Sequence, residues 1–302
     1  MEKRNTPNVP LLNPSQFDDY IFADWKPMVS GFYEKFHIAR VESYRNHLRI
    51  PLQPHRRSVF FFIFITKGLA VRSKGLTLYD VRPNHFFCLP ANEITSLEGV
   101  DEDTEGFYCH FLPEIFNQPF IKADVAKDFP FFQFTGEPLV QVQEPERIVK
   151  LLEILEKEYS INDNERFDLI PMYLMALFSE LKHLSQPAEQ NNKNAATFIT
   201  QRYKNALSEF IYEKKTVQEF SEYLAISPNH LHKCVKATIG KSAHELLEDM
   251  RILEAKVLLK QTTMSIGEIA FKLGRFDPSD FSRFFKSKTS MTPREYRQFE
   301  ID

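Results

Sequence analysis

The chain has 302 residues, of which 43% are hydrophobic and 26% are charged. This composition excludes a disordered chain, and the length suits two domains better than one small core. No uncharged apolar stretch approaches the roughly 20 residues of a membrane helix, and the N-terminus has no apolar segment behind its charges. We therefore expect a cytoplasmic protein that makes no membrane contact.

The formal net charge of −3 is unevenly distributed. Residues 195–302 contain 17 Lys and Arg against 14 Asp and Glu, a net charge of +3, which leaves −6 for residues 1–194. A mildly basic C-terminal part is typical of nucleic-acid binding but does not by itself identify it. The cysteines are odd in number and widely spaced, which argues against a disulfide framework or a zinc site and favours small buried side chains: Cys88, Cys109 and Cys234.

Residues 30–140 have the pattern of an antiparallel β domain. Residues 59–65 form a continuous apolar run, which is typical of a strand buried on both faces. Shorter strand-like segments follow between turn residues, at 69–72, 76–81, 86–89 and 107–112. Many short strands of this kind predict a small antiparallel barrel or jelly roll. We expect the Phe-rich segment 129–132 to lie in its core.

From Pro145 onward the apolar period changes from two residues to 3.6. Two apolar stripes, from Ile148 to Tyr159 and from Phe167 to Leu181, predict an antiparallel helical pair at about 145–184. Each stripe has to be buried against the β domain or against the same pair in a second copy of the chain.

A linker is expected after the helical pair. The polar segment 185–194 has no periodicity. It would separate a domain of residues 1–184 from a domain of residues 195–302.

Residues 195–302 are expected to be helical. A leading helix at about 196–213 is followed by six helix starts. Two of these place proline in the first turn, after Ser227 and Asp277. The other four are capping boxes, in which a hydroxyl and a carboxylate satisfy helix-start amides reciprocally, at Thr216, Ser242, Ser265 and Thr292. The segment predicts an all-α bundle of seven helices.

Two stretches of this bundle, 217–236 and 266–286, share a pattern of a short helix, a tight break and a second helix. This arrangement leaves the outer face of the second helix free, which is the geometry that enters a DNA major groove. The apolar residues at i and i+4 of each second helix are expected to face inward. The outward positions can contact phosphates and base edges, and we expect them to bind DNA: Asn229, His232, Lys233, Lys236, Ser279, Ser282, Arg283 and Lys286.

A single charged helix face is more typical of a solvated surface than of DNA contact. Two such helices joined by the helix from Ser242 to about Lys260 favour DNA, because that connecting helix spans about 30 Å. Successive faces of a major groove lie about 34 Å apart. One chain can therefore place both second helices on one side of a duplex, and it would bend the duplex if their separation falls short.

Residues 195–299 resemble the DNA-binding domain of the AraC/XylS family. The resemblance implies a sequence-specific transcription regulator, an activator that works with RNA polymerase, and a homodimer. It places Asn229, His232 and Lys233 in the first recognition helix. The second would hold Ser279, Ser282 and Arg283. The residues that carry the resemblance occur in family order: 227–231, 240–242, 251–259, 265–270, 281–286 and 292–297.

The sequence departs from the family pattern at three places. Gly274 is followed by Arg275 instead of Phe, which leaves the register of the second turn open. Lys233 stands in place of the more usual Arg and lacks its bidentate geometry. Ser290 stands where Gly is common, which predicts strain in the last turn. We therefore expect the first unit to dominate specificity.

The N-terminal region is similar to the cupin-like sensing domains of the same family, in which a β-barrel precedes a dimerising helical pair. The resemblance implies a small-molecule effector, and His55, Tyr108 and His110 are candidate lining residues, although each is also typical of a satisfied core or surface position. A metal-dependent cupin needs several convergent histidines and a carboxylate. Because His55 is followed by two arginines and His85 and His110 stand alone, we expect no catalysis, no metal and no cofactor.

The predicted fold class is therefore α+β in two domains, a cupin-like antiparallel barrel with a helical pair and an all-α double helix-turn-helix domain. Two functional alternatives stay open. In one, the barrel is a metal-dependent or metal-independent enzyme, or a small-molecule-binding protein, and the helical half is accessory. In the other, the helical domain binds protein, in an association that salt would not weaken as it weakens DNA binding.

Overall fold

The computed structural model describes residues 11–22, 31–119, 121–134, 136–161, 166–184, 195–274 and 277–299. These residues divide into two compact units, one within 11–184 and one within 195–299. The predicted linker, 185–194, and the unusual residue Arg275 lie outside the described residues. In the described part of the chain, no helix combines the length and apolar character that crossing a membrane requires.

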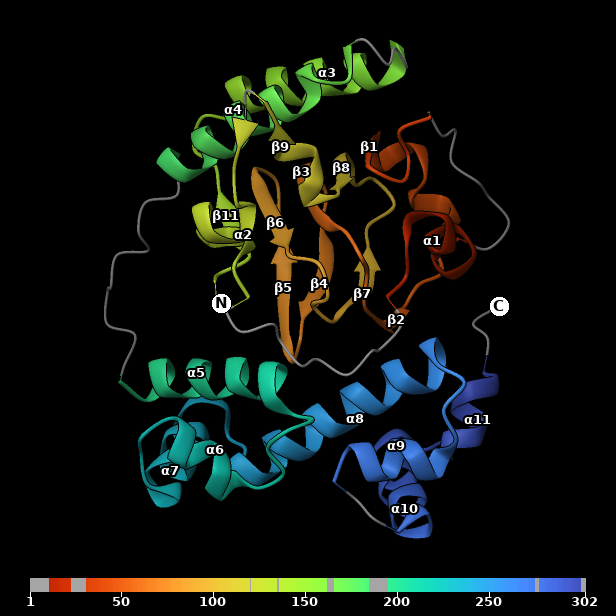
Figure 1. Ribbon diagram of the computed structural model, residues 1–302, viewed down its shortest axis with the longest axis vertical. Helices are drawn as coiled ribbons and strands as arrows, with labels where there is room; N and C mark the ends of the chain where they lie inside the picture. The colour runs from red at the N-terminus through yellow and green to blue at the C-terminus, as the bar shows by residue number, and fades with distance from the viewer. Residues whose placement is uncertain are drawn as a thin grey trace. The chain divides into compact units, whose positions relative to one another are not determined.

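The N-terminal unit is rich in antiparallel strands (Figure 1). Its larger sheet comprises, in spatial order, β1 (Phe36–Arg40), β8 (Glu105–Phe111), β3 (Phe60–Lys67), β6 (His85–Leu89) and β11 (Leu139–Gln141). Its smaller sheet comprises β2 (Leu52–His55), β7 (Thr95–Val100), β4 (Ala70–Lys74) and β5 (Thr77–Val81). A separate ribbon joins β9 (Asn117–Gln118) and β10 (Ile121–Lys122).

The N-terminal unit also contains helices. The longer ones are α1 (Pro14–Ile21), α3 (Pro145–Ile161) and α4 (Leu169–Leu184), and α2 (Val125–Asp128) is a single turn. Short 3₁₀ turns lie at Val41–Ser43, Arg45–His47, Pro113–Phe116 and Pro130–Phe132. The sequence interpretation identified the helical pair α3 and α4 but missed α1.

Strand β3 is buried on both faces, as its continuous apolar run predicted. The side chains at positions 60, 62 and 64 belong to a core that the larger sheet shares with α3 and α4. Those at positions 61, 63 and 65 belong to a second core, which also contains residues of α1 and the smaller sheet. Because successive side chains of a strand point to opposite faces, a strand in a middle layer needs apolar residues at every position.

The two predicted helical stripes are buried within the same unit. The inward residues of α3 and α4, including Leu152, Leu155, Leu177 and Phe178, lie in the core that contains one face of the larger sheet. Burial against the β domain, one of the two alternatives for these stripes, is therefore confirmed. The Phe-rich segment 129–132 also contributes to this core.

The strands form two separate sheets, and in the described residues their hydrogen bonds do not close a barrel. Consecutive strands β3 and β4 illustrate the reason: β3 pairs with β6 and β8, whereas β4 pairs with β5 and β7. Gly68 between them has a φ of 76°, and a Cβ atom there would lie 2.7 Å from the Cα of Thr104. Glycine allows this close approach and directs the chain from one sheet to the other. The two sheets agree with the β-rich domain expected from the sequence, whereas the cupin-like barrel is not confirmed.

The C-terminal unit is helical. It contains α5 (Ala195–Phe210), α6 (Val217–Tyr223), α7 (Pro228–Ile239), α8 (Ala243–Gln261), α9 (Ile266–Lys272), α10 (Pro278–Thr289) and α11 (Pro293–Gln298). The four predicted capping boxes are present, with Thr216, Ser242, Ser265 and Thr292 as N-caps. Ser227 and Asp277 cap α7 and α10, each followed by proline. All six predicted helix starts are therefore confirmed.

Helix α8 connects two similar halves of this unit (Figure 1). Helices α6 and α7 pack near one end of α8, and α9 and α11 pack near the other. Helix α5 packs along α7, and α10 packs against α9 and α11. Each half thus consists of a short helix and a longer second helix supported by neighbours on its inner side.

Candidate nucleic-acid interface and apolar pocket

Helix α7 is the second helix of the first helix-turn-helix unit. Its inner side chains, Leu231 and Val235, are fully buried, in a helix that packs against α5, α6 and α8. The predicted DNA-contacting side chains of α7 are all exposed: Asn229, His232, Lys233 and Lys236. The structure therefore brings two lysines, a histidine and an asparagine together on one accessible helix.

Helix α10 repeats this arrangement. Phe281 and Phe285 are fully buried, while Ser279, Arg283 and Lys286 are exposed. Ser282 is half-buried, and its hydroxyl donates to the carbonyl of Pro278 at 2.7 Å, so its oxygen is left mainly as an acceptor.

Arg283 supplies one of the positive charges of the α10 face. Its Nη2 atom lies 3.8 Å from a carboxylate oxygen of Asp280, and both side chains are exposed. An exposed ion pair of this length contributes little free energy. Phosphate can therefore replace Asp280 as the partner of Arg283 without a large loss.

Each of the two turns contains a residue in the left-handed conformation. Between α6 and α7, Ala225 has a φ of 57°, and between α9 and α10, Gly274 has a φ of 75°. Each second helix also ends on a left-handed residue, Gly240 with a φ of 74° and Ser290 with a φ of 65°. The positive φ at Ser290 confirms the strain that its sequence position predicted.

Helix α8 sets the spacing between the two units. Its 19 residues give a length of about 28 Å, somewhat less than the 34 Å or so between successive faces of a major groove. In Figure 1, α7 lies beside the left end of α8, and α10 lies below its right-hand part. The unit thus presents one polar, basic helix near each end of its connecting helix.

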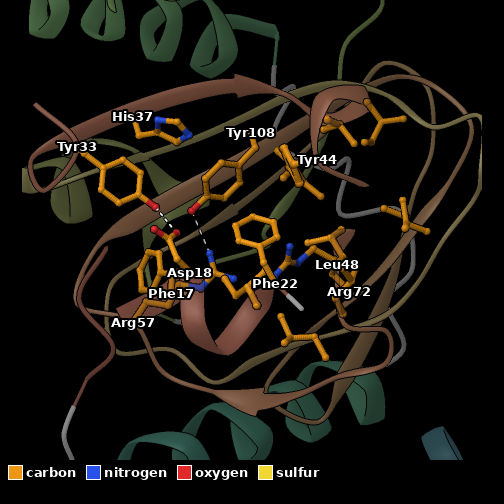
Figure 2. A pocket seen from close by; sticks show the side chains of 18 residues that line it. Phe17, Asp18, Phe22, Tyr33, His37, Tyr44, Leu48, Arg57, Arg72 and Tyr108 are labelled. Carbon is orange, nitrogen blue, oxygen red and sulfur yellow. Dashed lines mark hydrogen bonds between the residues drawn. The ribbon is translucent and has the colours of Figure 1, made fainter. Parts of the chain in front are cut away.

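A pocket lies between the two sheets of the N-terminal unit (Figure 2). Helix α1 and strands of both sheets supply its walls, and most of the lining side chains are aliphatic or aromatic, including Phe17, Ile63 and Leu97. Tyr108 lines this pocket, as predicted, but His55 and His110 are not among its lining residues.

His55 and His110 instead hold the groups that line the pocket. Arg57 Nε donates to His55 Nε2 at 3.0 Å, and Arg57 Nη1 donates to the Tyr108 hydroxyl at 3.0 Å. The Tyr108 hydroxyl lies 3.1 Å from His110 Nδ1, and His110 Nε2 lies 2.9 Å from the carbonyl of Tyr33. A carbonyl only accepts, so His110 Nε2 carries the proton and Nδ1 accepts from Tyr108.

The same reasoning fixes the second histidine. His55 Nδ1 lies 2.9 Å from the carbonyl of Gln53, so this nitrogen carries the proton and Nε2 accepts from Arg57. Burial holds the pKa of both histidines well below the usual value, and each is therefore neutral. The histidines fix the position of Arg57 and Tyr108, which fits the alternative of satisfied core positions.

Two buried arginines line the pocket, and the sequence interpretation did not identify them as a site. Arg57 and Arg72 are 3% and 5% exposed, and their guanidinium carbons lie 4.6 and 5.0 Å from the ring centre of Phe61. The sequence contained the His-Arg-Arg segment at 55–57 but gave no sign of burial, because arginine is normally a surface residue.

A metal centre was not expected from the sequence. Within the ranges that the structure describes, no group of three or more His, Cys, Asp or Glu side chains is placed to hold a metal ion. His85 lies outside the pocket lining, with Nδ1 near the carbonyls of Arg82 and Pro83. Cys88, Cys109 and Cys234 are free and buried, as their spacing predicted.

Comparison with known proteins identifies the helical unit. A family model described as a helix-turn-helix domain matches residues 220–298. The uncharacterized HTH-type transcriptional regulator YisR of Bacillus subtilis is 26% identical over 255 residues, covering 80% of this chain and 86% of that protein. The arabinose operon regulatory protein of Salmonella typhimurium is 24% identical over 307 residues, covering 97% of this chain and 98% of that protein. These similarities support an AraC/XylS-type regulator.

Among solved structures, ToxT from Vibrio cholerae aligns over 87% of this chain and 97% of its own, with 16% identity and a TM-score of 0.39. Within the AraC/XylS pattern, the residues of the first unit are all described. The departure at Arg275 in the second unit lies outside the described residues, so the register of that turn stays a prediction.

Proposed function

We propose that this AraC/XylS regulator binds promoter DNA through α7 and α10, and that the pocket of its N-terminal unit senses a small molecule. One observation carries the DNA proposal. Two helices about 50 residues apart in sequence each bury their i and i+4 side chains and expose a basic, hydrogen-bonding face. The eight side chains predicted from the sequence are the proposed contacts.

Within both helices, the basic and the neutral polar side chains would make different contacts with DNA. Lys and Arg contact phosphates and the acceptor edge of guanine, while Asn, His and Ser contact base edges. Lys233 and Lys236 in α7 and Arg283 and Lys286 in α10 would supply the charge. Because α8 is shorter than the groove repeat, simultaneous insertion of α7 and α10 would bend the duplex towards the protein.

The remaining properties implied by the family stay proposals for this chain: an activator acting with RNA polymerase, a cytoplasmic location, and a homodimer. Exposed apolar side chains on α3 and α4 support a contact with a second copy. Ile154, Ile161 and Met172 are 37%, 46% and 38% exposed. Two facing sheets around a pocket also agree with a cupin-like sensing domain, although its barrel is open.

Fluorescence anisotropy with a labelled duplex from upstream of the protein's own gene tests the DNA proposal. Lys233→Ala and Arg283→Ala should each weaken specific binding by about 1–3 kcal/mol, which is roughly 5- to 150-fold in Kd. Lys122→Ala, which removes an exposed lysine of β10, is the matched control and should bind as the wild type does.

Salt dependence separates the alternatives. DNA affinity should fall steeply with salt because phosphate contacts release counterions, and each of the two substitutions should flatten that dependence. Wild-type affinity in both variants would refute the assigned contacts. A salt-insensitive association with a protein, in place of DNA binding, would identify the helical unit as a protein-binding domain.

A further inference from the structure

Arg72 is a buried cation with unsatisfied hydrogen-bonding groups. Its side chain lines the pocket (Figure 2), and its Nε and Nη2 atoms are buried without a hydrogen-bond partner. Native proteins satisfy nearly all buried polar groups, and an orphaned one indicates an absent water, ion or ligand. A charged guanidinium is costly to leave in this state, because burial removes its hydration as well.

A second cation increases that cost. Arg57 also approaches the ring of Phe61, lines the same pocket, and interacts electrostatically with Arg72. The partners of Arg57 are neutral, His55 and Tyr108. No ion pair of Arg57 or Arg72 occurs among the described residues.

Arg72 remains charged at neutral pH. Burial is the main cause that lowers its pKa, and the neighbouring charge of Arg57 lowers it further, to about 9. A water molecule would satisfy an N–H group but would leave both charges uncompensated. An anion would satisfy the donors and the charge together, and guanidinium groups bind carboxylates through paired, charge-assisted hydrogen bonds.

The charges around the pocket indicate the charge of this anion. The described lining residues with a formal charge are Asp18, Arg57 and Arg72, one negative and two positive. The carboxylate of Asp18 accepts a hydrogen bond from the Tyr33 hydroxyl at 2.7 Å. His37 is neutral at pH 7, because burial lowers its pKa to about 4. The net charge of the lining is therefore +1, and a ligand with a single negative charge neutralises it.

The rest of the lining indicates the body of the ligand. Aromatic and aliphatic side chains from α1 and both sheets surround the two arginines, among them Phe17, Phe22 and Leu52. We propose that the pocket binds an organic monocarboxylate with a compact apolar body, whose carboxylate is held by Arg72 and Arg57. This inference rests on the proposed sensing function and names the chemical class that is sensed.

The test uses the full-length protein and pairs of probes that differ only in charge: benzoate with benzamide, phenylacetate with phenylacetamide, and hexanoate with hexanamide. Thermal unfolding and isothermal titration calorimetry should show binding of at least one carboxylate, with its amide at least about tenfold weaker because it loses the charge-assisted bonds. Equal binding of acid and amide, or no binding of any carboxylate, overturns the proposal. Tighter binding of inorganic phosphate overturns the choice of a carboxylate.

Variants test the assigned residue. Arg72→Met should lose the preference for the acid, and Arg72→Lys, which keeps the charge, should retain part of it. Arg82→Met removes an exposed arginine that pairs with Asp80 and should behave as the wild type. Retained acid preference in Arg72→Met overturns the assignment. If that variant does not fold, the acid and amide comparison on the wild type still decides.

The same preparations distinguish this inference from the proposed function. DNA binding is measured by anisotropy with and without the probe that binds best. If the protein binds DNA normally but binds no carboxylate, only the ligand assignment is refuted. Carboxylate binding without any DNA binding would remove only the regulator proposal. A bound carboxylate that shifts DNA affinity connects the two.

Discussion

The C-terminal residues of the two second helices provide a matched pair of stability experiments. Helix α7 ends at Gly240 and α10 ends at Ser290, and both residues are left-handed, with their N–H groups donating to the carbonyls of Lys236 and Lys286. A non-glycine residue in this conformation costs roughly 1–2 kcal/mol. Replacing Ser290 by glycine removes that cost, and the greater freedom of glycine in the unfolded chain returns about 0.4–1 kcal/mol of it.

Ser290→Gly should therefore stabilise the helical unit by about 0.5–1 kcal/mol, which corresponds to a rise of about 2–6 °C in Tm for a domain of this size. Gly240→Ser should have the opposite effect. A Cβ atom at Gly240 would meet no atom within 4 Å, so its cost is confined to the backbone. Because separated substitutions usually add, the double variant should return close to the wild type.

Urea and thermal unfolding of the full chain provide the assay. Far-UV circular dichroism follows mainly the helices. Ser290→Ala is the control, because it removes the hydroxyl and keeps the side-chain carbon. If Ser290→Gly is no more stable than Ser290→Ala, backbone strain at this position is not the cause and the reasoning fails.

Three further predictions concern stability. Arg251 donates to Glu248 at 2.6 Å inside the helical unit, and Arg251→Met should cost about 3–5 kcal/mol in urea unfolding because Glu248 stays buried. Gly68→Ala should lower the Tm of the N-terminal unit by several degrees, because one of its two sheets has to shift; an unchanged Tm would contradict the close approach. Hydrogen bonds within the capping boxes lower the pKa of four glutamates, so their stabilisation is present above the usual Glu pKa of about 4.3 and is lost as the pH falls through the folded-state values. Circular dichroism should show this loss in acid, and glutamine variants should reduce it, at Glu219, Glu245, Glu268 and Glu295.

Features that depend on neighbours in sequence could be predicted. A capping box needs only a hydroxyl, a carboxylate three residues later and the intervening backbone, so the helix starts of the C-terminal unit were readable from residues such as Thr216 and Ser265. The same signal was available for α1, where Asn13 is the N-cap, Pro14 follows it and Gln16 completes the box. This box has an amide N-cap, so it does not match the pattern of a hydroxyl followed by a carboxylate.

Features that depend on distant pairing could not be predicted. The apolar run in β3 indicates two buried faces, but it does not indicate that β3 pairs with β8 while β4 joins another sheet. The pocket depends on that topology. Arg72 and Tyr108 lie on different sheets, and only the way in which the sheets face each other makes them lining residues of one pocket. Because arginine is normally a surface residue, the sequence gave no reason to predict that Arg57 and Arg72 are buried.

The two helix-turn-helix units are alike in backbone but differ in where their glycines lie. Each unit needs one left-handed residue in its turn and another at the end of its second helix, and each has a single glycine for the two positions. The first unit places glycine at the helix end and Ala225 in the turn, whereas the second places Gly274 in the turn. A Cβ atom at Gly274 would lie 2.8 Å from the side chain of Lys215, whose ammonium group donates to backbone carbonyls near the ends of α5 and α9. Contact with Lys215 and the positive φ therefore favour glycine in the second turn, and Ser290 takes the other left-handed conformation in the described part of that unit.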